Sequence, residues 1–472
     1  MQKRTADLGV APLGSLLLRL SVPAIAGMLV MALYNIIDTY WAGRLGTEAV
    51  AALTVVLPWQ MIVGALGVST GVGVSSLVSR RFGEGRGEAA NRTAGQTVLL
   101  ACTVGPLLAV AAVIFSLPVV RLFGATSALE GLARDYLHTL ALGVPFVLFL
   151  MSTSGLYRGS GNTVFPTITI CTSAVLNAIF APLLILGPFG LPRLGVAGLG
   201  LATALSQFLA SLVAMAYLWS RHSGFRVRLR HLRPDREIIQ DIAQVGAPAF
   251  AMQVVGSVVI SLYNGVLGGF GTAAIAAFGI NIRLMMLVMM PIFGTSQGLL
   301  PIVGFNYGAR KYDRMWRGVS IAAVGTGLAG LFLGAALWLG APALTRLFTS
   351  EPELERLTVL ALRLTVVTLW LAGPQIMFVS AMQGMGHGTH ALILALTRQL
   401  IFLTPGLYLL SHRFGITGAY AAQPVADVFS FVVTAGFLWY MVRRYRPDRA
   451  PLAGGSASAL GVRARTARPP LM

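Results

Sequence analysis

Long hydrophobic segments, separated by short polar stretches, follow one another along almost the whole chain. A helix that crosses a bilayer needs about 20 predominantly apolar residues, and twelve segments meet this requirement. The pattern therefore predicts an all-α polytopic membrane protein with twelve transmembrane helices. These helices are expected to start near residues 20, 49, 94, 137, 164, 196, 245, 273, 318, 363, 390 and 417.

The second half of the chain repeats the pattern of the first half. One proline and four glycines recur 225 positions later, and GTEAVAAL at 46–53 matches GTAAIAAF at 271–278. Each repeat contains six helices, and an even number of spans inserts both repeats in the same orientation. We therefore expect two six-helix lobes with pseudo-twofold symmetry and a substrate site between them. The repeated residues are Pro23, Gly46, Gly83, Gly159 and Gly161, which recur as Pro248, Gly271, Gly308, Gly384 and Gly386.

The repeat and the charged stretches divide the chain into four parts. Residues 1–220 form the predicted amino-terminal lobe, and residues 245–442 form the predicted carboxyl-terminal lobe. An Arg-rich linker at 221–244 joins the lobes on the side that carries most of the basic residues. Residues 443–472 form a basic tail whose composition predicts disorder.

The composition supports a membrane protein and excludes several other classes. Hydrophobic residues make up 56% of the 472 residues and charged residues 11%, whereas soluble proteins carry about 25% charged residues. A soluble enzyme of this length would lack the polar residues to cover its surface. A disordered chain and a disulfide scaffold are excluded by the same composition.

The charge distribution predicts the orientation of the helices. The chain has 35 basic and 16 acidic residues, and roughly 25 of the basic residues fall on one side of the predicted helices, against about 8 on the other. The positive-inside rule makes the basic side cytoplasmic, together with both termini. We expect a multi-pass protein of a bacterial-type inner membrane, with the lipid bilayer as its surroundings and no nucleic-acid partner.

The acidic residues single out two positions. Fourteen of the sixteen fall in predicted loops, tails or helix ends, which leaves Asp38 in the first helix and Asp427 in the twelfth. A carboxylate near the bilayer centre costs about 2.5–3.5 kcal/mol on insertion scales, so such a residue is a functional candidate by default. Because burial favours the neutral form, each could carry a proton across the membrane.

Several segments resemble the multidrug and toxic-compound extrusion (MATE) family, and the similarity covers nearly all of residues 15–445. The resemblance implies twelve helices in two lobes and the export of cationic amphiphilic compounds in exchange for protons or sodium. It implies no cofactor beyond the coupling ion, and we expect a monomer. The segments are NIIDTYWAGRLGTEAVAAL, SRRFGEGRGEAANR, YRGSGNT, LPIVGFNYGARK and AAQPVAD.

The resemblance also assigns an ion site in the amino-terminal lobe. Asp38 matches the family's coupling aspartate, and Asn177 and Thr203 match two of its partners. The family's second aspartate is replaced by Ala181, which favours protons, because hard cations prefer several charged oxygens. Asn35 is a further candidate, since it lies three residues before Asp38 on one helix face.

The carboxyl-terminal lobe differs at the corresponding position. The repeat places Tyr263 where the first lobe has Asp38, so this carboxylate is not duplicated. Arg398 lies in the middle of the eleventh helix and needs a counter-charge, for which Asp427 is the natural candidate. A static ion pair and a role in coupling remain equally open for these two residues.

Other residues are candidates for helix bending and substrate binding. Pro23 removes a backbone hydrogen bond from the first helix, although membrane helices also tolerate ordinary prolines. Aromatic faces at Tyr34 and Tyr263 could bind a cation, and the flexible thioethers of Met286 and Met290 suit a site that accepts many shapes. Packing inside the protein or against lipid is the alternative for all four.

Functions of other classes are weighed against export. A lipid-linked saccharide flippase of related architecture would place Arg283 and Arg398 in its cavity. An enzyme is disfavoured, because the two mid-helix acids lie on different helices and form no catalytic pair. His387 and His390 would need further ligands to bind a metal, so no metal site is expected.

Overall fold

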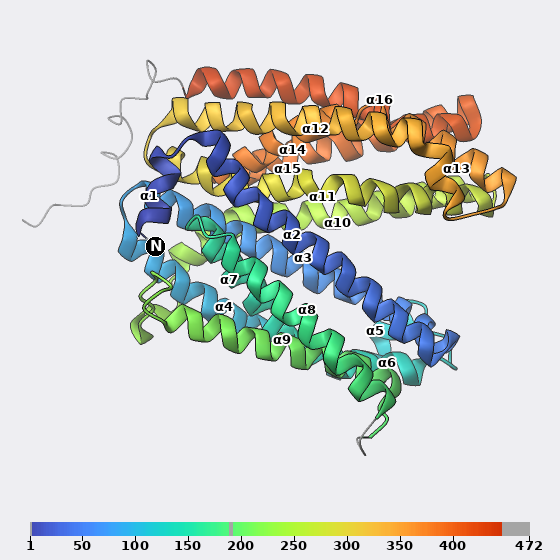
Figure 1. Ribbon diagram of the computed structural model, residues 1–472, viewed down its shortest axis with the longest axis horizontal. Coiled ribbons are helices and arrows are strands. Elements are labelled where there is room, and N and C mark those ends of the chain that lie inside the picture. The colour runs from blue at the N-terminus through green and yellow to red at the C-terminus, as the bar shows by residue number, and fades with distance from the viewer. Residues whose placement is uncertain (1, 188–191, 446–472) are drawn as a thin grey trace, which may run out of the picture.

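The chain folds into helices throughout the part that the computed structural model describes, residues 2–187 and 192–445 (Figure 1). The first nine helices run to Trp219, and the others begin after the connection between the lobes. The first group comprises α1 (Gln2–Val10), α2 (Leu13–Leu45), α3 (Thr47–Gly83), α4 (Gly87–Ile114), α5 (Ser116–Leu122), α6 (Glu130–Ala141), α7 (Val144–Gly159), α8 (Val164–Leu186) and α9 (Gly195–Trp219). The second group comprises η2 (Leu229–Leu232), α10 (Arg236–Gly268), α11 (Thr272–Gly308), α12 (Tyr312–Arg346), α13 (Pro352–Val366), α14 (Leu369–Gly384), α15 (Gly388–Leu396), η3 (Thr397–Leu403) and α16 (Thr404–Arg444).

The helices account for the predicted number of spans. Among the described residues, nine helices are long and apolar enough to cross a membrane, or eleven if the bent pairs α6–α7 and α13–α14 each form one span. The longest, Gly388–Arg444, has 57 residues, which at about 1.5 Å per residue is far longer than one bilayer crossing. Its backbone leaves the helical conformation at Gly415, and Leu403 and Leu407 pack against Ala419. This helix therefore folds back on itself as two spans, which confirms the twelve-helix prediction.

The repeat is visible in the backbone. Helices α3 and α11 both have 37 residues, and each follows a glycine with positive φ, 113° at Gly46 and 105° at Gly271. The broken spans α6–α7 and α13–α14 bend by 48° and 52°. The two lobes thus share their turns and their helix lengths, which confirms the predicted two-lobe architecture.

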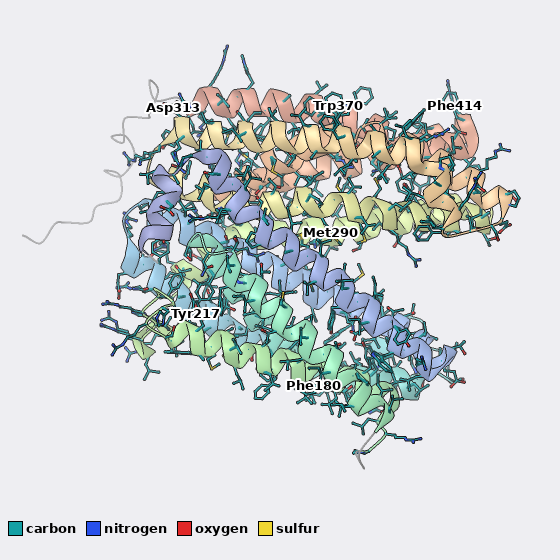
Figure 2. All side chains as sticks on the ribbon, viewed as in Figure 1. Phe180, Tyr217, Met290, Asp313, Trp370 and Phe414 are labelled. Atoms are coloured by element: carbon teal, nitrogen blue, oxygen red, sulfur yellow. The ribbon has the colours of Figure 1, made fainter. Side chains whose placement is uncertain are left out.

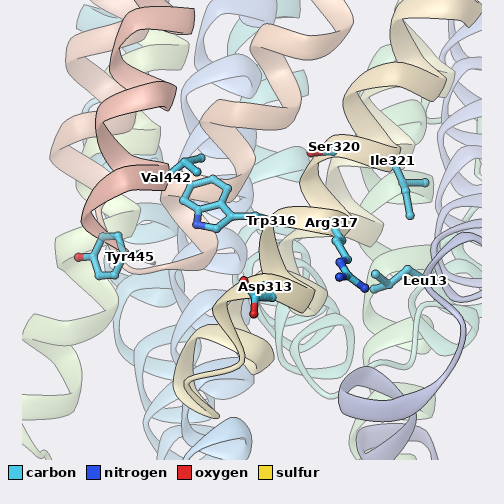
Figure 3. A pocket seen from close by; sticks show the side chains of 8 residues that line it. All are labelled: Leu13, Asp313, Trp316, Arg317, Ser320, Ile321, Val442 and Tyr445. Atoms are coloured by element: carbon cyan, nitrogen blue, oxygen red, sulfur yellow. The ribbon is translucent and has the colours of Figure 1, made fainter. Parts of the chain in front are cut away.

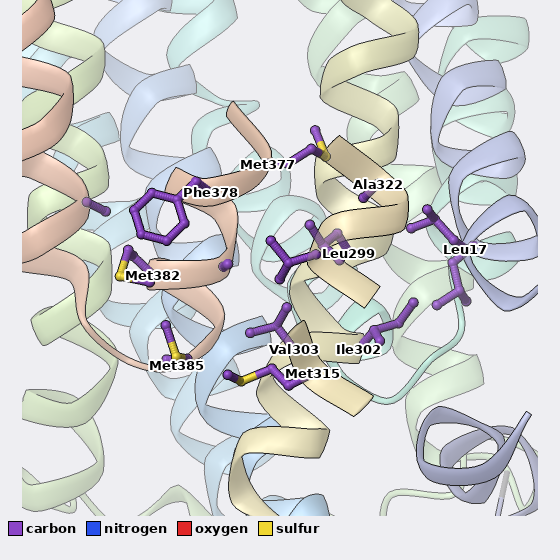
Figure 4. Packing of buried hydrophobic residues seen from close by; sticks show 14 of the residues in the cluster. Leu17, Leu299, Ile302, Val303, Met315, Ala322, Met377, Phe378, Met382 and Met385 are labelled. Carbon is purple, nitrogen blue, oxygen red and sulfur yellow. The ribbon is translucent and has the colours of Figure 1, made fainter. Parts of the chain in front are cut away.

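Two helices exchange partners between the lobes. The first half of α2 contributes Leu16, Leu17 and Leu20 to a core formed by α11, α12 and α14 of the carboxyl-terminal lobe. Figure 4 shows Leu17 in this core. The first half of α10 contributes Ile238 and Ile242 to the core of the amino-terminal lobe. Beyond Pro23, α2 returns to its own lobe and packs against α8 and α9. Each lobe therefore packs half of one of its helices, α2 or α10, into the core of the other lobe.

The lobes meet at one end and spread apart toward the other (Figure 1). A Cβ atom added to Gly83 of α3 would overlap the carbonyl oxygen of Phe305, and one added to Gly308 of α11 would overlap that of Arg80. Gly83 and Gly308 are repeat equivalents, as are Arg80 and Phe305, so α3 and α11 cross at a symmetric point. The meeting end also carries the basic segments.

Helix α1 lies across this meeting end. The Thr5 hydroxyl donates to the carbonyl of Ser160 in the amino-terminal lobe at 3.2 Å. The Asn306 amide donates to the carbonyl of Leu8 at 3.0 Å, and Leu8 itself is fully buried in the core shared by α2 and the carboxyl-terminal lobe. The short polar α1 was not predicted, because it falls below the length and hydropathy of a spanning helix.

Several predicted boundaries differ from the structure. Starts that lie six to eleven residues before the expected positions are found in α2, α4, α6, α12 and α13. Helix α10 begins at Arg236 rather than near residue 245, because the Asp235 carboxylate accepts from the first free amides of the helix and starts it earlier. The predicted tail overlaps α16, which continues to Arg444. Residues 446–472 of this predicted tail lie outside the described residues.

Candidate functional site

Four polar side chains meet inside the amino-terminal lobe, where α2 approaches α8 and α9. The Tyr34 hydroxyl lies 3.1 Å from that of Thr203, and the Asn177 amide donates to the same Thr203 oxygen at 3.2 Å. The Asp38 carboxyl, one turn beyond Tyr34, interacts with both Tyr34 and Asn177. The structure therefore brings together Asp38, Asn177 and Thr203, which the sequence placed on three separate helices.

The Asp38 carboxyl is incompletely bonded. Its Oδ1 atom is shielded from solvent and has no hydrogen-bond partner in the described part of the chain. An unmatched buried carboxyl oxygen is costly unless it carries a proton or receives an ion. Ala181, one turn beyond Asn177, is fully buried and offers no oxygen. The cluster thus has a single acidic group with room for one proton.

Asn35 stays outside this cluster. Its side chain is exposed, and only its backbone carbonyl is engaged, by the Thr39 hydroxyl at 2.9 Å. Asn35 lies three residues before Asp38 and is therefore near it on the surface of α2. Because successive residues are rotated by about 100° around the helix, the Asn35 side chain nevertheless points away from α8 and α9. The structure does not join Asn35 to the candidate ion site.

A second buried carboxylate lies in the carboxyl-terminal lobe and is fully bonded. Asp427 is 3% exposed; its Oδ1 accepts from Arg398 Nε at 2.7 Å and its Oδ2 from the Thr368 hydroxyl at 2.9 Å. Gln375 donates to the Asp427 carbonyl and accepts from Ser430. The predicted ion pair is present, and no oxygen of the carboxylate is left free.

The backbone around Arg398 is adapted to this pair. Residues Thr397–Leu403 form a π-helix between α15 and α16, and π segments inside α-helices are frequently found at functional sites. Tyr263 comes close enough to interact electrostatically with both Arg398 and Asp427. Helices α10, η3 and α16 therefore build a polar centre at the place where α2, α8 and α9 build the Asp38 cluster.

The candidate substrate residues divide into two groups. Tyr263 is 3% exposed and stacks on Phe278 with ring centroids 4.8 Å apart, so its face is covered within the lobe. Tyr34 is engaged with Thr203. Met286 is 62% exposed, and Figure 2 places the half-buried Met290 on α11 near α2, where the lobes adjoin. Of these four residues, Met290 is the one that lies where the lobes adjoin.

A model of the MatE family matches residues 23–183 and 248–409, one block in each lobe. The chain belongs to the MatE family. The two matched blocks start at Pro23 and Pro248, which are the repeated prolines of α2 and α10. The family membership confirms the resemblance seen in the sequence, and the protein is therefore a multi-pass transport protein.

Relatives of known name or structure agree with the MatE match. The multidrug export protein MepA of Staphylococcus haemolyticus is 26% identical over 437 residues, which cover 92% of this chain and 95% of the relative. A multidrug resistance MATE transporter solved in an outward-facing conformation is 28% identical, with a TM-score of 0.86 over 93% of this chain and 98% of its own. A MATE structure in the bent conformation is 27% identical, with a TM-score of 0.88 and coverage of 95% and 99%.

The contacts of two arginines in this MatE chain were not predicted from the sequence. Arg158 of α7 donates to the side-chain carbonyl of Gln297 in α11, across the interface between the lobes. Arg80 of α3 lies beside Gly386 at the same end. Both sit next to recurrent glycines, in segments that read as basic loops, and only the repeated glycines signalled that helices approach each other there.

The remaining candidates make few contacts. Arg283 is exposed and forms no ion pair with any described residue. His387 donates to or accepts from the Tyr445 hydroxyl at 3.0 Å, and its ring lies edge-on to His390. Within residues 2–187 and 192–445, no three His, Cys, Asp or Glu side chains gather as metal ligands would.

Proposed function

We propose that the protein is a secondary active multidrug efflux antiporter that exports cationic amphiphilic compounds in exchange for protons by alternating access. The observation that carries the proposal is the Oδ1 atom of Asp38, which is shielded from water and has no hydrogen-bond partner among the described residues. A group in this position can take up a proton without displacing an existing ion pair. The names of the related multidrug exporters support the substrate class.

The division of α2 between the lobes supports a route from protonation to movement. Leu16 and Leu20 hold the first half of the helix in the carboxyl-terminal core, whereas Asp38 belongs to the amino-terminal lobe. Pro23 lies between the two anchored parts, and its carbonyl accepts from the Thr167 hydroxyl at 2.6 Å. Protonation of Asp38 would weaken its attraction to the polar groups of α8 and α9. The outer half of α2 could then shift against the inner half.

The donor set favours protons over sodium. Sodium is a hard cation and prefers several oxygens, including charged ones. Beside Asp38, the cluster offers only neutral groups from Tyr34, Asn177 and Thr203, while Ala181 occupies the place of the family's second acid. A proton needs only the one carboxyl oxygen.

The arrangement of the lobes supports an outward-facing conformation in the bacterial inner membrane. The lobes meet at the end that carries the basic segments, which the positive-inside rule assigns to the cytoplasm together with both termini. The other end, where α5, α6 and α13 lie, is spread apart. A bound compound would then leave toward the outside, while α3 and α11 close the path from the cytoplasm.

Drug efflux in everted membrane vesicles tests the proposal. The proton gradient and the sodium gradient are collapsed separately, and the transport of a fluorescent cationic dye is followed. We expect transport to stop when the proton gradient is removed and to continue without sodium. Loss of transport only with the sodium gradient would overturn the proton assignment, and undiminished transport without either gradient would overturn antiport.

A lipid-linked saccharide flippase remains the second candidate, because Arg283 is exposed on α11 and has no ionic partner among the described residues. A cationic wall suits an anionic headgroup. The pairing of Arg398 with Asp427 counts against this alternative, since a paired arginine contributes no net charge to a cavity. Cysteine introduced at 283 separates the two: labelling from the aqueous space between the lobes would favour the flippase, and lack of labelling would favour drug export.

A further inference from the structure

A pocket of about 480 Å³ opens at the basic end of the carboxyl-terminal lobe, between the start of α2, the start of α12 and the end of α16 (Figure 3). Its volume lies within the range of about 300–1,000 Å³ of ordinary small-molecule sites. Leu13, Ile321 and Val442 supply an apolar wall. The pocket is separate from both polar centres, and nothing in the transport cycle described above uses it.

Two opposite charges line this pocket without pairing. Asp313 and Arg317 lie one helical turn apart on α12, where i and i+4 side chains are neighbours, yet no ion pair joins them to each other or to another described residue. Figure 3 shows both on the same side of the helix, with Leu13 beside the Arg317 guanidinium. The pocket therefore presents one free anionic and one free cationic group.

The indole ring of Trp316 also lines the pocket. Its Nε1 atom is buried and has no acceptor in the described part of the chain. Unmatched buried donors are uncommon, because each costs about 1–3 kcal/mol, and Trp is typical of the level of lipid headgroups in membrane proteins. The Tyr445 hydroxyl on the opposite wall is already engaged by His387. Trp316 thus indicates that the pocket lies at the headgroup level, while its buried Nε1 is not open to a ligand in the pocket.

Chemistry and position narrow the ligand. A ligand here must carry an anion for Arg317, a hydrogen-bonding cation for Asp313 and an apolar part for the wall. In phosphoethanolamine, two carbon atoms separate the phosphate from the ammonium group, a spacing that suits charges one helical turn apart. The apolar residues continue onto the membrane-facing surface, where Ile321 is 43% exposed. A lipid chain can lie along that surface.

We propose that this pocket binds the headgroup of an aminophospholipid of the phosphatidylethanolamine class. The phosphate contacts Arg317, and the ammonium group donates to the Asp313 carboxylate. A choline headgroup lacks N–H donors for Asp313. A glycerol headgroup leaves the Asp313 carboxylate facing an anionic lipid. The site therefore selects the primary amine.

Thermal unfolding of the full chain in detergent, with dioleoyl lipids added, tests the selection. We expect phosphatidylethanolamine to raise the unfolding temperature at about two- to fivefold lower concentration than phosphatidylcholine, which is the range of one exposed ionic contact. The N-monomethyl lipid should fall between them. Equal effects of the three lipids would overturn the proposal, and a larger effect of phosphatidylglycerol would replace the aminophospholipid by an anionic lipid.

Two substitutions assign the contacts. Asp313→Asn should remove the preference for ethanolamine over choline, whereas Arg317→Gln should weaken the binding of both lipids because both carry the phosphate. Glu353→Gln and Arg356→Gln change the same charges on exposed residues of α13, far from the pocket, and should alter neither property. A preference that survives Asp313→Asn would overturn the assignment. The comparison of lipids on the unaltered protein keeps the test valid if a variant does not fold.

Discussion

The two lobes share a backbone plan but not the chemistry at their centres. In the amino-terminal lobe, Asp38 lies among neutral polar groups, and its Oδ1 has no hydrogen-bond partner in the described part of the chain. In the carboxyl-terminal lobe, Asp427 has both oxygens bonded, one of them to Arg398. Equivalent helices of the two repeats therefore hold different acids. The acid of the first lobe has no counter-charge among the described residues, and the acid of the second lobe is paired with an arginine.

This difference indicates that the two buried acids have different roles, although both are isolated acids within membrane helices. A carboxylate paired with arginine in a water-poor interior keeps its charge, because removing it would leave the arginine uncompensated. A carboxyl among hydroxyl and amide groups can gain or lose a proton without breaking an ion pair. The repeat thus supplies the scaffold twice, and the second copy has Tyr263 where the first has Asp38. Under the proposed function, ion coupling would be confined to the amino-terminal lobe.

The largest expected effect comes from Asp38→Asn. The amide keeps the shape of the side chain but cannot release a proton, so drug-stimulated proton movement in proteoliposomes should fall to the level of protein-free vesicles. Asp135→Asn removes an exposed acid from the same lobe and should leave proton movement unchanged. Unchanged exchange in the Asp38 variant would show that the coupling group lies elsewhere.

The ion pair in the other lobe should affect stability first. Replacing Arg398 by Gln or Asp427 by Asn leaves one buried charge alone and should cost about 3–5 kcal/mol in the free energy of unfolding. The double variant should lose less than either single variant. The exposed pair Arg346–Glu355, at 2.8 Å, is the control, and Arg346→Gln should cost less than about 1 kcal/mol. Additive losses in the double variant would argue against pairing.

Substitutions of the two equivalent glycines at the crossing of α3 and α11 should have equal effects. An added methyl group at Gly83 or Gly308 meets the backbone of the opposite helix, and overpacking of this kind costs about 1–3 kcal/mol. Both Ala variants should open the meeting end and raise the labelling of cysteines placed there. Gly64→Ala on α3 meets nothing within 4 Å and serves as the control. A strong effect from one glycine alone would break the symmetry.

The smallest expected effect distinguishes two tyrosines. Tyr34→Phe removes the hydroxyl that lies 3.1 Å from that of Thr203 and should cost about 0.5–1.5 kcal/mol. The Tyr263 hydroxyl is buried and forms no hydrogen bond within the described residues, so Tyr263→Phe should leave the unfolding temperature nearly unchanged. Comparable losses in the two variants would mean that the Tyr263 hydroxyl has a partner that contributes to stability.

Much of the fold followed from the sequence, because hydropathy and repetition report directly on membrane spans. The twelve helices and the two lobes were predicted from segment lengths and from the 225-residue offset. The Arg398–Asp427 pair was predicted as well, since a charge in the middle of a membrane helix requires a partner. These features depend on the free-energy cost of placing a side chain in lipid. This cost is a property of the residue type and can be read from the sequence.

Other features depend on how helices turn toward one another. Spacing along α2 could not show that Asn35 faces away from α8 and α9 while Tyr34 faces Thr203. The exchange of helix halves at Leu20 and Ile242 is equally hidden, because a leucine or isoleucine packs in either lobe without a change in hydropathy. The link between Arg158 and Gln297 joins segments that nothing in the sequence brings together.

The position of α1 has a practical consequence. This helix contacts both lobes at the end where they meet, through Thr5 on one side and Leu8 on the other. A fusion partner placed before Gln2 would therefore add bulk next to the end where the lobes meet. If this end is the cytoplasmic gate of the proposed function, the size of the partner would bias the balance between the two conformations. Reporter domains and purification tags are better attached after Arg444. Amino-terminal fusions of increasing size would be expected to keep the meeting end open to an increasing degree, which would favour the inward-facing state of the proposed cycle.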